Sequence, residues 1–250
     1  LQNVKSDKHK DSVNITMDVE PTSETLEQLT DRNSQWRKDL RSALKAKDRT
    51  AIPRIIMPEL DAEYRSHTRT EEVNRGLTKE MAIKEAHRCL DCVKPSCIEG
   101  CPVNINIPSF IKNIERGQFI AAAKVLKNTS SLPAVCGRVC PQEKQCESKC
   151  IHLKMGEPAV AIGYLERFAA DFERESGNIV IPELGQSKGI KVAAVGSGPA
   201  GLSFAGEMAK KGYDVTVFEA LHEIGGVLKY GIPEFRLPNK IVDVEIENLK

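Results

Sequence analysis

The sequence predicts two consecutive folding units, a helical unit that contains every cysteine and, behind it, the start of an α/β unit. All eight cysteines lie between Cys89 and Cys150. Near residue 188 the pattern changes to a short apolar strand, and a glycine-rich turn follows that strand directly. A chain of 250 residues is long enough for two domains. We expect a disordered tail over 1–22, the helical unit over 23–187 and the α/β unit over 188–250.

The composition excludes several classes of protein. Because 36 Lys and Arg residues are balanced by 35 Asp and Glu residues, no excess of basic charge is present to hold a nucleic acid. Hydrophobic residues make up 40% of the chain, which is enough for a buried core. No run approaches the roughly 18 apolar residues that a membrane span needs, and the first residues contain no apolar signal segment. We expect a cytoplasmic protein that contacts neither nucleic acid nor membrane.

The first part of the helical unit has apolar residues at helical spacing between Leu26 and Leu44. This spacing predicts one or two amphipathic helices, which two following prolines end. We expect them to form an arm that packs on the core. Further along, Thr78 is a typical N-cap, and strong helix formers follow it as far as Ala86. That helix leads into Cys89 and would aim the first cysteines.

Three more helices are predicted around the remaining cysteines. Two of them, over 108–114 and 119–126, are separated at Gly117. The third is predicted from Pro158 to about Arg174, because proline is favoured in the first helical turn and a glycine follows its expected end. We therefore expect a helical unit whose loops carry the thiols.

The cysteines form two groups of four with related spacing. They are Cys89, Cys92, Cys97 and Cys101, then Cys136, Cys140, Cys146 and Cys150. A disulfide framework is disfavoured, because such frameworks belong to small secreted domains. Zinc is a second alternative, but its sites usually pair two C-x2-C units, and only the first two cysteines form one. Iron–sulfur clusters fit better, since Cys101 and Cys140 each precede a proline, as the last cysteine of a bacterial ferredoxin run does. The pattern predicts two clusters and leaves open which thiol serves which.

Glu166 lies within the helix predicted from Pro158. Its neighbours at three and four residues, among them Ile162 and Ala170, are uncharged. A carboxylate buried on such a face needs a partner, because burying it unpaired is costly. From spacing alone, a salt bridge or a solvated edge is favoured over ligation of a cluster.

A strand, a turn with the pattern G-x-G-x-x-G, a helix and a second strand follow one another from Val192 to Phe218. This context makes the pattern typical of dinucleotide binding. Gly196 permits the tight turn, Gly198 lets the backbone approach a pyrophosphate, and Gly201 allows the helix to pack closely on the strand.

Glu219 follows the second strand and is expected to bind ribose hydroxyls, which disfavours a 2′-phosphate at this site. We expect FAD rather than NAD, because a flavin can divide the two electrons of a hydride into single electrons for the clusters. Arg236 could pair with a phosphate or the flavin edge, or only cap a loop. The expected cofactor-binding residues are Gly196, Ser197, Gly198, Pro199, Ala200, Gly201, Glu219, Gly226, Leu228 and Arg236.

Four segments together closely resemble one protein family. They are residues 89–101, Cys136-Gly-Arg-Val-Cys140-Pro with Cys146 and Cys150, Gly196-Ser-Gly-Pro-Ala-Gly201, and Gly231-Ile-Pro-Glu-Phe-Arg-Leu-Pro238. From about Arg65 to Lys250 the chain resembles the small (beta) subunit of NADPH-dependent glutamate synthase. It also resembles the N-terminal module of dihydropyrimidine dehydrogenase and the related subunit of ferredoxin:NADP transhydrogenases. The resemblance implies an α-helical ferredoxin domain with two [4Fe–4S] clusters, followed by the start of a Rossmann-like FAD-binding domain.

The same resemblance implies the ligands of each cluster. One cluster would take the thiolates of Cys89, Cys92, Cys97 and Cys150, and the other those of Cys101, Cys140 and Cys146 with a side-chain oxygen of Glu166. The dehydrogenase branch has Gln where this chain has Glu166. Cys136 would then be a spare thiol.

The family continues with a second dinucleotide fold for NADPH, whereas this chain has a single G-x-G-x-x-G and ends at Lys250. We therefore expect a truncated fragment that cannot transfer hydride from NADPH on its own. For the intact protein, the resemblance implies electron transfer from NADPH through FAD and the clusters to a large catalytic subunit of glutamate synthase, which converts 2-oxoglutarate and glutamine into glutamate. A dihydropyrimidine dehydrogenase or transhydrogenase partner is one alternative. A zinc-binding interaction module without enzymatic activity is another.

Overall fold

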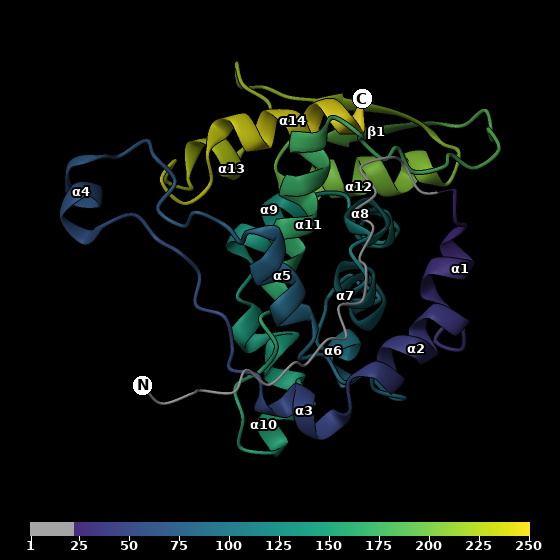
Figure 1. Cartoon of the computed structure of the whole chain (residues 1–250). Helices are drawn as coiled ribbons and strands as arrows, with labels where there is room; N and C mark the ends of the chain where they lie inside the picture. The colour runs from purple at the N-terminus through teal and green to yellow at the C-terminus, as the bar shows by residue number, and fades with distance from the viewer. Residues whose placement is uncertain (1–22) are drawn as a thin grey trace, which may run out of the picture.

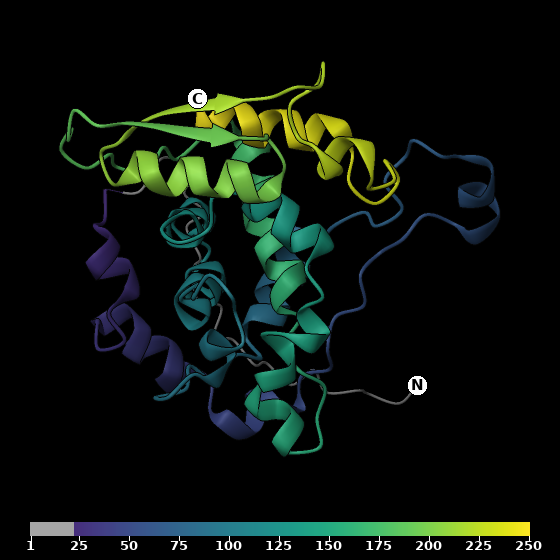
Figure 2. The same ribbon diagram turned by 180° about the vertical axis from the view of Figure 1, so that it is seen from behind.

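The computed structural model describes residues 23–250, so the tail expected over 1–22 lies outside the described residues. The helices of the cysteine-containing unit stand side by side, and the α/β layer lies across one end of them (Figure 1). Seen from behind, the helix of the α/β layer lies between its two strands and the helical unit (Figure 2). Within residues 23–250, every helix is too short or too polar to cross a membrane.

The N-terminal arm has two short helices where the sequence predicted one or two, between Leu26 and Leu44, and a third that follows them. Thr25 caps the first of them by accepting the backbone N–H of Gln28. Asp31 follows its end and accepts the N–H of Asn33, a local bond that competes with continuation of the helix. The three helices are α1 (Leu26–Thr30), α2 (Gln35–Ala43) and α3 (Ala46–Ala51).

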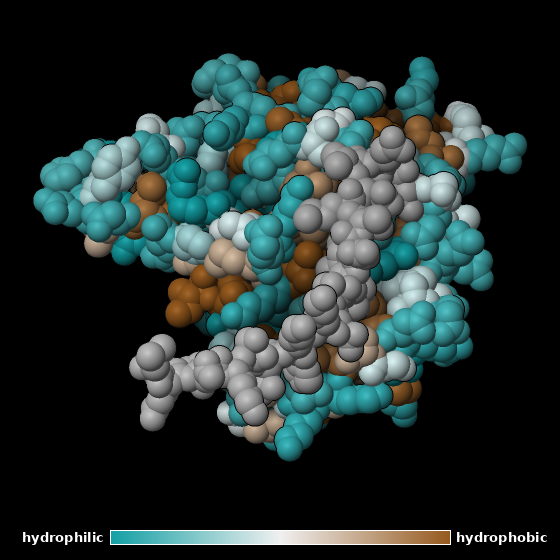
Figure 3. Space-filling model, in the orientation of Figure 1, coloured by the Kyte–Doolittle hydropathy of each residue, from teal (hydrophilic) through white to brown (hydrophobic). Residues whose placement is uncertain are grey.

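A loop after the arm stands out from the body of the protein and carries helix α4 (Ala62–His67) near its tip (Figure 1). This helix was not predicted from the sequence. The two sides of the loop pair through an antiparallel bridge between Glu59 and Asn74. The projecting part is mainly hydrophilic on the face shown in Figure 3.

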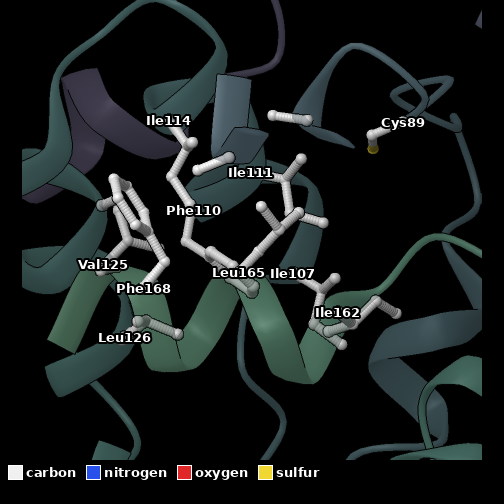
Figure 4. Close-up of a cluster of buried hydrophobic side chains, with 14 of the residues drawn as sticks. Cys89, Ile107, Phe110, Ile111, Ile114, Val125, Leu126, Ile162, Leu165 and Phe168 are labelled. Atoms are coloured by element: carbon white, nitrogen blue, oxygen red, sulfur yellow. The ribbon is translucent and has the colours of Figure 1, made fainter. Parts of the chain in front are cut away.

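The main core lies between four helices, of which three confirm predicted helices to within a residue or two. Phe110 and Ile111 face Leu165 and Phe168 across this core, and Cys89 lies at its edge (Figure 4). The first thiol therefore stands on a rigid apolar scaffold. The four helices are α5 (Lys79–Ala86), α7 (Ile107–Glu115), α8 (Phe119–Lys127) and α11 (Ile162–Ser176).

The sequence predicted that helix α11 begins at Pro158, but it begins at Ile162. Residues 158–161 are not helical, because their backbone bonds to side chains of the turn before Cys89. Arg88 donates to the carbonyl of Pro158, and Glu85 accepts the N–H of Ala161. These bonds replace the first turn of the predicted helix.

The sequence led us to expect all the thiols on loops, but some of them lie elsewhere. Cys97 and Cys136 lie on short helices, and Cys150 directly precedes another. Each of these helices spans two turns or fewer. Its backbone hydrogen bonds hold the cysteine that lies in it or directly before it. The elements are α6 (Ser96–Glu99), α9 (Pro133–Val139), two 3-10 turns (Gln142–Lys144 and Glu147–Lys149) and α10 (Ile151–Lys154).

The α/β layer contains two parallel strands in which Val192 lies opposite Val215. The second strand was predicted correctly. The predicted helix after the glycine-rich turn begins at Pro199, because proline fits the first helical position. The elements are β1 (Lys191–Val195), α12 (Pro199–Lys210), β2 (Asp214–Phe218), α13 (Val227–Tyr230) and α14 (Asn239–Leu249).

A second apolar core joins the α/β layer to the helical unit. Val135 of α9 and Ala170 of α11 pack in one cluster with Leu202 of α12 and Val242 of α14. The boundary that we predicted at residue 187 remains a prediction, but this shared core shows that the two parts are packed against each other.

Candidate iron–sulfur and nucleotide sites

Four thiols surround one cavity beside the main core. Cys89, Cys92, Cys97 and Cys150 all line this cavity, which has a volume of about 210 Å³. Its other walls include apolar side chains of α7 and of the segment before α11. A water molecule occupies about 30 Å³ in the liquid, so the space between the thiols is several times larger than a single ion needs. These are the four cysteines that the family resemblance assigns to one cluster.

Side-chain bonds bring the two ends of the cysteine region together. Glu85 and Arg88 precede the first cysteine, and both bond to the segment that follows Cys150. Both side chains are fully buried, and they form an ion pair of 2.8 Å with each other. His152 adds a further link of 2.9 Å between its Nε2 atom and the carbonyl of Arg88. The convergence of Cys89 and Cys150 is thus built from buried polar contacts.

Asp91 holds the loop between the first two cysteines. Its backbone is left-handed, with φ of 52°, and its carboxylate is completely buried. Arg37 and Arg41 of the N-terminal arm bind that carboxylate at 2.6 and 2.5 Å, while Arg32 donates to its backbone carbonyl at 2.9 Å. The guanidinium groups lower the pKa of Asp91 against the effect of burial, which raises it. The arm therefore clamps the Cys89–Cys92 loop rather than merely packing on the core.

A second buried ionic cluster lies behind Cys89. Lys112 is fully buried and donates to the carbonyl of Cys89 at 2.6 Å. It also pairs with Glu115, which Arg49 binds at 2.8 Å. Although burial opposes it, contacts with His87, Lys112 and Arg49 lower the pKa of Glu115 to about 2. The resulting excess of positive charge beside the cavity suits an anionic thiolate-bound cluster.

Ionisation of the thiols in the first group is unfavourable, because they are buried and close to one another. Burial raises the pKa of Cys89 to about 11. The pKa of Cys97 is raised by burial first and then by the charges of Cys89, Cys150 and Cys92. Thiolates are the form that binds metal. A cationic iron core would remove the mutual repulsion of these thiolates, so the donor set fits a cluster.

The second group of ligands gathers where α9 crosses α11. A side chain at Gly137 would place its Cβ 2.5 Å from the backbone nitrogen of Arg167, so the two helices touch backbone to backbone. Cys136 and Cys140 flank this contact on one side, and Glu166 precedes it on the other. The charges of Glu166 and Cys101 both contribute to raising the pKa of Cys146 to about 12, after burial and Glu147.

Glu166 is the side chain that spacing alone had assigned to a salt bridge or a solvated edge. The structure contradicts both, because Glu166 is 5% exposed and its Oε1 atom is buried without a hydrogen-bond partner. Burial raises the pKa of Glu166 well above its ordinary value, and the charges of Cys140 and Glu245 raise it further. An orphaned buried oxygen beside Cys140 is what an oxygen ligand of a cluster requires.

Cys136, the thiol to which the resemblance gives no ligand role, lies on α9 one helical turn before Cys140. A hydrogen bond between the side chains of Cys136 and Cys140 lowers the pKa of Cys140 to about 7 and raises that of Cys136.

Within residues 23–250, no three His, Cys, Asp or Glu side chains are close enough together to hold a single metal ion.

We expect Arg37→Ala to destabilise the protein by about 3 kcal/mol, the usual cost of breaking a buried ion pair from one side. Arg65→Ala is the matched control, because Arg65 pairs with Glu59 at an exposed position, where loss of a pair costs less than about 1 kcal/mol. Unfolding by guanidinium, followed by circular dichroism, measures both. Equal effects of the two substitutions would show that the arm does not hold the Asp91 loop.

The glycine-rich turn has the form that the sequence predicted. Gly196 has a φ of 95°, and a Cβ on Gly201 would overlap the carbonyl oxygen of Gly196. In contrast, a Cβ on Gly198 would meet nothing within 4 Å. Gly226, with φ of 52°, packs so closely on Gly198 that its own Cβ would lie 2.8 Å from the Gly198 Cα atom. The open side of Gly198 leaves room for a pyrophosphate at the N-terminus of α12.

Glu219 lies at the carboxyl end of β2, as predicted, but its carboxylate is engaged within the protein. Ser197 donates its backbone N–H to Glu219 at 2.9 Å and its hydroxyl to the same oxygen, and Leu221 donates its N–H at 2.8 Å. Chiefly the Ser197 hydroxyl, with these N–H groups, lowers the pKa of Glu219 to about 2. These bonds use most of the roughly four acceptor sites of a carboxylate, so a contact of Glu219 with ribose hydroxyls remains a prediction.

The remaining predicted nucleotide-binding residues differ in their surroundings. Ser197 is fully buried and also accepts the N–H of Gly225 at 3.0 Å, so it ties the turn to the Gly225-Gly226 loop. Leu228 is buried in the second core, and Arg236 is exposed. Their contacts with a nucleotide remain predictions.

A pair of substitutions separates folding from nucleotide binding. We expect Gly201→Ala to destabilise the α/β layer, because the new Cβ would overlap a backbone oxygen that cannot move away. We expect Gly198→Ala to fold normally, since its Cβ enters open space, but to retain much less flavin. Thermal unfolding and the flavin content of purified protein measure the two effects. Normal flavin content in Gly198→Ala would contradict the assignment of this turn.

Sequence reasoning missed the residues that hold the first site in place. Asp91 stands between two cysteines, and Arg37 and Arg41 stand one helical turn apart, so an acidic loop residue facing a basic helix face was the available signal. Lys112 gave no signal, because a lone lysine in an amphipathic helix usually faces solvent.

Two protein families match parts of this chain. Residues 65–178 match the family described as dihydropyrimidine dehydrogenase domain II, 4Fe–4S cluster, and residues 195–245 match the NAD(P)-binding Rossmann-like domain. The NAD-dependent dihydropyrimidine dehydrogenase subunit PreT of Escherichia coli (strain K12) is 40% identical over 180 residues, covering 72% of this chain and 43% of PreT.

Glutamate synthase [NADPH] small chains are similar to the same extent. The protein of Azospirillum brasilense is 35% identical over 178 residues, 71% of this chain and 37% of its own length. That of Halomonas elongata is 40% identical over 174 residues, 69% of this chain and 36% of its own length. This chain thus spans less than half the length of these relatives. The similarities confirm the resemblance predicted from the cysteine and glycine motifs.

Proposed function

From the homology of this chain to glutamate synthase small chains and to dihydropyrimidine dehydrogenase subunits, we propose that it is an electron-transfer module of an NADPH-dependent oxidoreductase. Two electrons enter together as a hydride. FAD separates them, and they leave one at a time through two [4Fe–4S] clusters. No residue of this chain is assigned to NADPH.

One observation carries the proposal. Thiols that are up to sixty residues apart in the sequence, from Cys89 to Cys150, line one cavity beside an apolar core. Buried ionic side chains hold that cavity from behind, as Lys112 and Asp91 do. An apolar core beside the thiols and charged groups behind them are an environment that keeps a cluster bound and sets its potential.

The ligands are proposed in two sets. Cys89, Cys92, Cys97 and Cys150 hold the first cluster, and Cys101, Cys140, Cys146 and Glu166 hold the second. The second set includes an oxygen ligand because Glu166 has a buried oxygen without a partner. FAD is proposed to bind along the turn from Gly196 to Gly201, with Glu219 toward the ribose.

The electron acceptor is the finer part of the proposal. A large subunit of glutamate synthase is the first candidate, since small chains of that enzyme are up to 40% identical to this chain. A pyrimidine-reducing partner is the second candidate. It is favoured by the 40% identity to PreT and by the dihydropyrimidine dehydrogenase domain match over residues 65–178.

Anaerobic purification followed by iron and sulfide analysis tests the function. We expect a brown protein with about eight iron and eight sulfide per chain, the content of two cubanes. A colourless protein that contains zinc instead would overturn the proposal in favour of the zinc-binding alternative. Candidate large subunits are then compared by co-purification with this chain.

A further inference from the structure

The second ligand group offers one donor more than a cubane has irons. Four side chains are already assigned to it by the proposed function, and Cys136 lies among them. Cys136 lies one helical turn before Cys140 on α9, and Gly137 beside it touches α11 at Arg167, next to Glu166. A [4Fe–4S] cluster takes one protein ligand at each of its four irons. Five donors therefore compete for four positions.

The crossing of α9 and α11 fixes Cys136 and Glu166 close together. Gly137 follows Cys136 and touches the backbone of Arg167, which follows Glu166. A second contact locks the same crossing, because Gln142 donates to the carbonyl of Cys136 at 3.0 Å while its amide fills the space beside Gly163. Cys136 and Glu166 thus lie on opposite sides of one backbone contact between the two helices.

Glu166 differs from the other buried acid on its own helix. Glu173 is 3% exposed and pairs with Lys127 at 2.8 Å. Glu166 is 5% exposed, yet its Oε1 atom has no partner. Since leaving a buried carboxylate unpaired is costly, its oxygen is placed for a ligand that the protein itself does not provide.

We propose that Glu166 and Cys136 are alternative ligands to the same iron of the second cluster, with Glu166 bound in the resting protein and Cys136 held in reserve. This inference rests on the proposed function. In the exchange, the bond from iron to the Glu166 oxygen breaks and a bond from iron to the Cys136 sulfur forms. The proton of the Cys136 thiol passes to the carboxylate of Glu166, and no electron is transferred.

The reserve thiol has a physical advantage. Thiolate is a softer donor than carboxylate and suits the irons of a cluster better, whereas a carboxylate oxygen is the weaker ligand and the one that leaves. Exchange also changes the ligand charge and hydrogen bonding around the cluster, on which its potential depends. One iron would therefore have two ligand states in the same protein fold.

Four variants test the inference in anaerobically purified protein. Glu166→Ala is expected to keep about eight irons per chain, because Cys136 replaces the lost oxygen. Cys136→Ala is also expected to keep about eight, since Glu166 is already bound. Cys136→Ala/Glu166→Ala is expected to fall to about seven after mild oxidation with ferricyanide and to give the electron paramagnetic resonance signal of a [3Fe–4S] cluster. Glu245→Gln is the control, because Glu245 is a buried acid near Glu166 that is not a ligand.

The outcomes separate this inference from the proposed function. Wild-type protein with about four irons or none would refute the second cluster itself and leave nothing for the inference to explain. Wild-type protein with about eight irons, together with loss of one iron in Glu166→Ala alone, would refute Cys136 as the reserve ligand. A double variant that keeps its full iron content through oxidation would show that neither side chain is a ligand.

Discussion

Replacement of both Cys92 and Cys150 by alanine is expected to halve the iron and sulfide content, from about eight of each to about four. The two thiols line the same cavity, and their removal leaves only two sulfur ligands there. Two ligands cannot retain a cubane against solvent, while the second group is untouched. Metal analysis and the visible absorption of the anaerobic protein measure the loss.

Cys136→Ala is the matched control for this experiment, since it removes a half-buried thiol that does not line that cavity. Circular dichroism should show that the helices of the double variant remain, because Cys92 lies outside the main core and Cys150 is only partly buried against it. Loss of all iron in the double variant would mean that the two ligand groups are not independent, and would refute the ligand assignment.

Gly137→Ala is expected to destabilise the protein by about 3 kcal/mol, the upper range for an overpacked site. The new Cβ would lie 2.5 Å from the nitrogen and 2.7 Å from the Cα atom of Arg167, and backbone atoms in a packed helix cannot yield as a side chain can. Helices α9 and α11 would separate, and Glu166 would move away from Cys140. We therefore expect the second cluster to be lost together with stability.

Guanidinium unfolding and iron analysis of the same preparation follow the two effects of Gly137→Ala. Gly198→Ala is the control, because it adds the same methyl group where nothing lies within 4 Å. If Gly137→Ala reduced stability but left the iron content at its normal level, the α9–α11 crossing would not be part of the second site.

The sequence predicted most of the elements that are built from local signals. The Thr78 cap, the helices over 108–114 and 119–126, and the strand after Asp214 all depend on residues within one turn or one strand. The start of α11 was wrong because the side chains that bond to residues 158–161 belong to a segment seventy residues earlier. Contacts between distant segments leave no periodic trace in the sequence.

The candidate site could be predicted only in part, because it too depends on contacts between distant segments. Spacing indicated two clusters, but the grouping of Cys89 with Cys150 came from the family resemblance, and the cavity that they share agrees with it. Spacing favoured a salt bridge or a solvated edge for Glu166, because the packing of α9 that buries its carboxylate cannot be read from the sequence of α11 alone. The arginine clamp on Asp91 was missed, since its charges come from a helix fifty residues away.

The second apolar core has a consequence for how fast electrons can move. Residues beside the glycine-rich turn and residues beside Cys136 share one set of close-packed side chains, including Val135, Leu202 and Val242. Close-packed interiors resist compression, so this core would hold the proposed flavin and the proposed second cluster at a nearly fixed separation. Because tunnelling slows steeply with distance, such a separation would keep the rate of electron transfer between them steady.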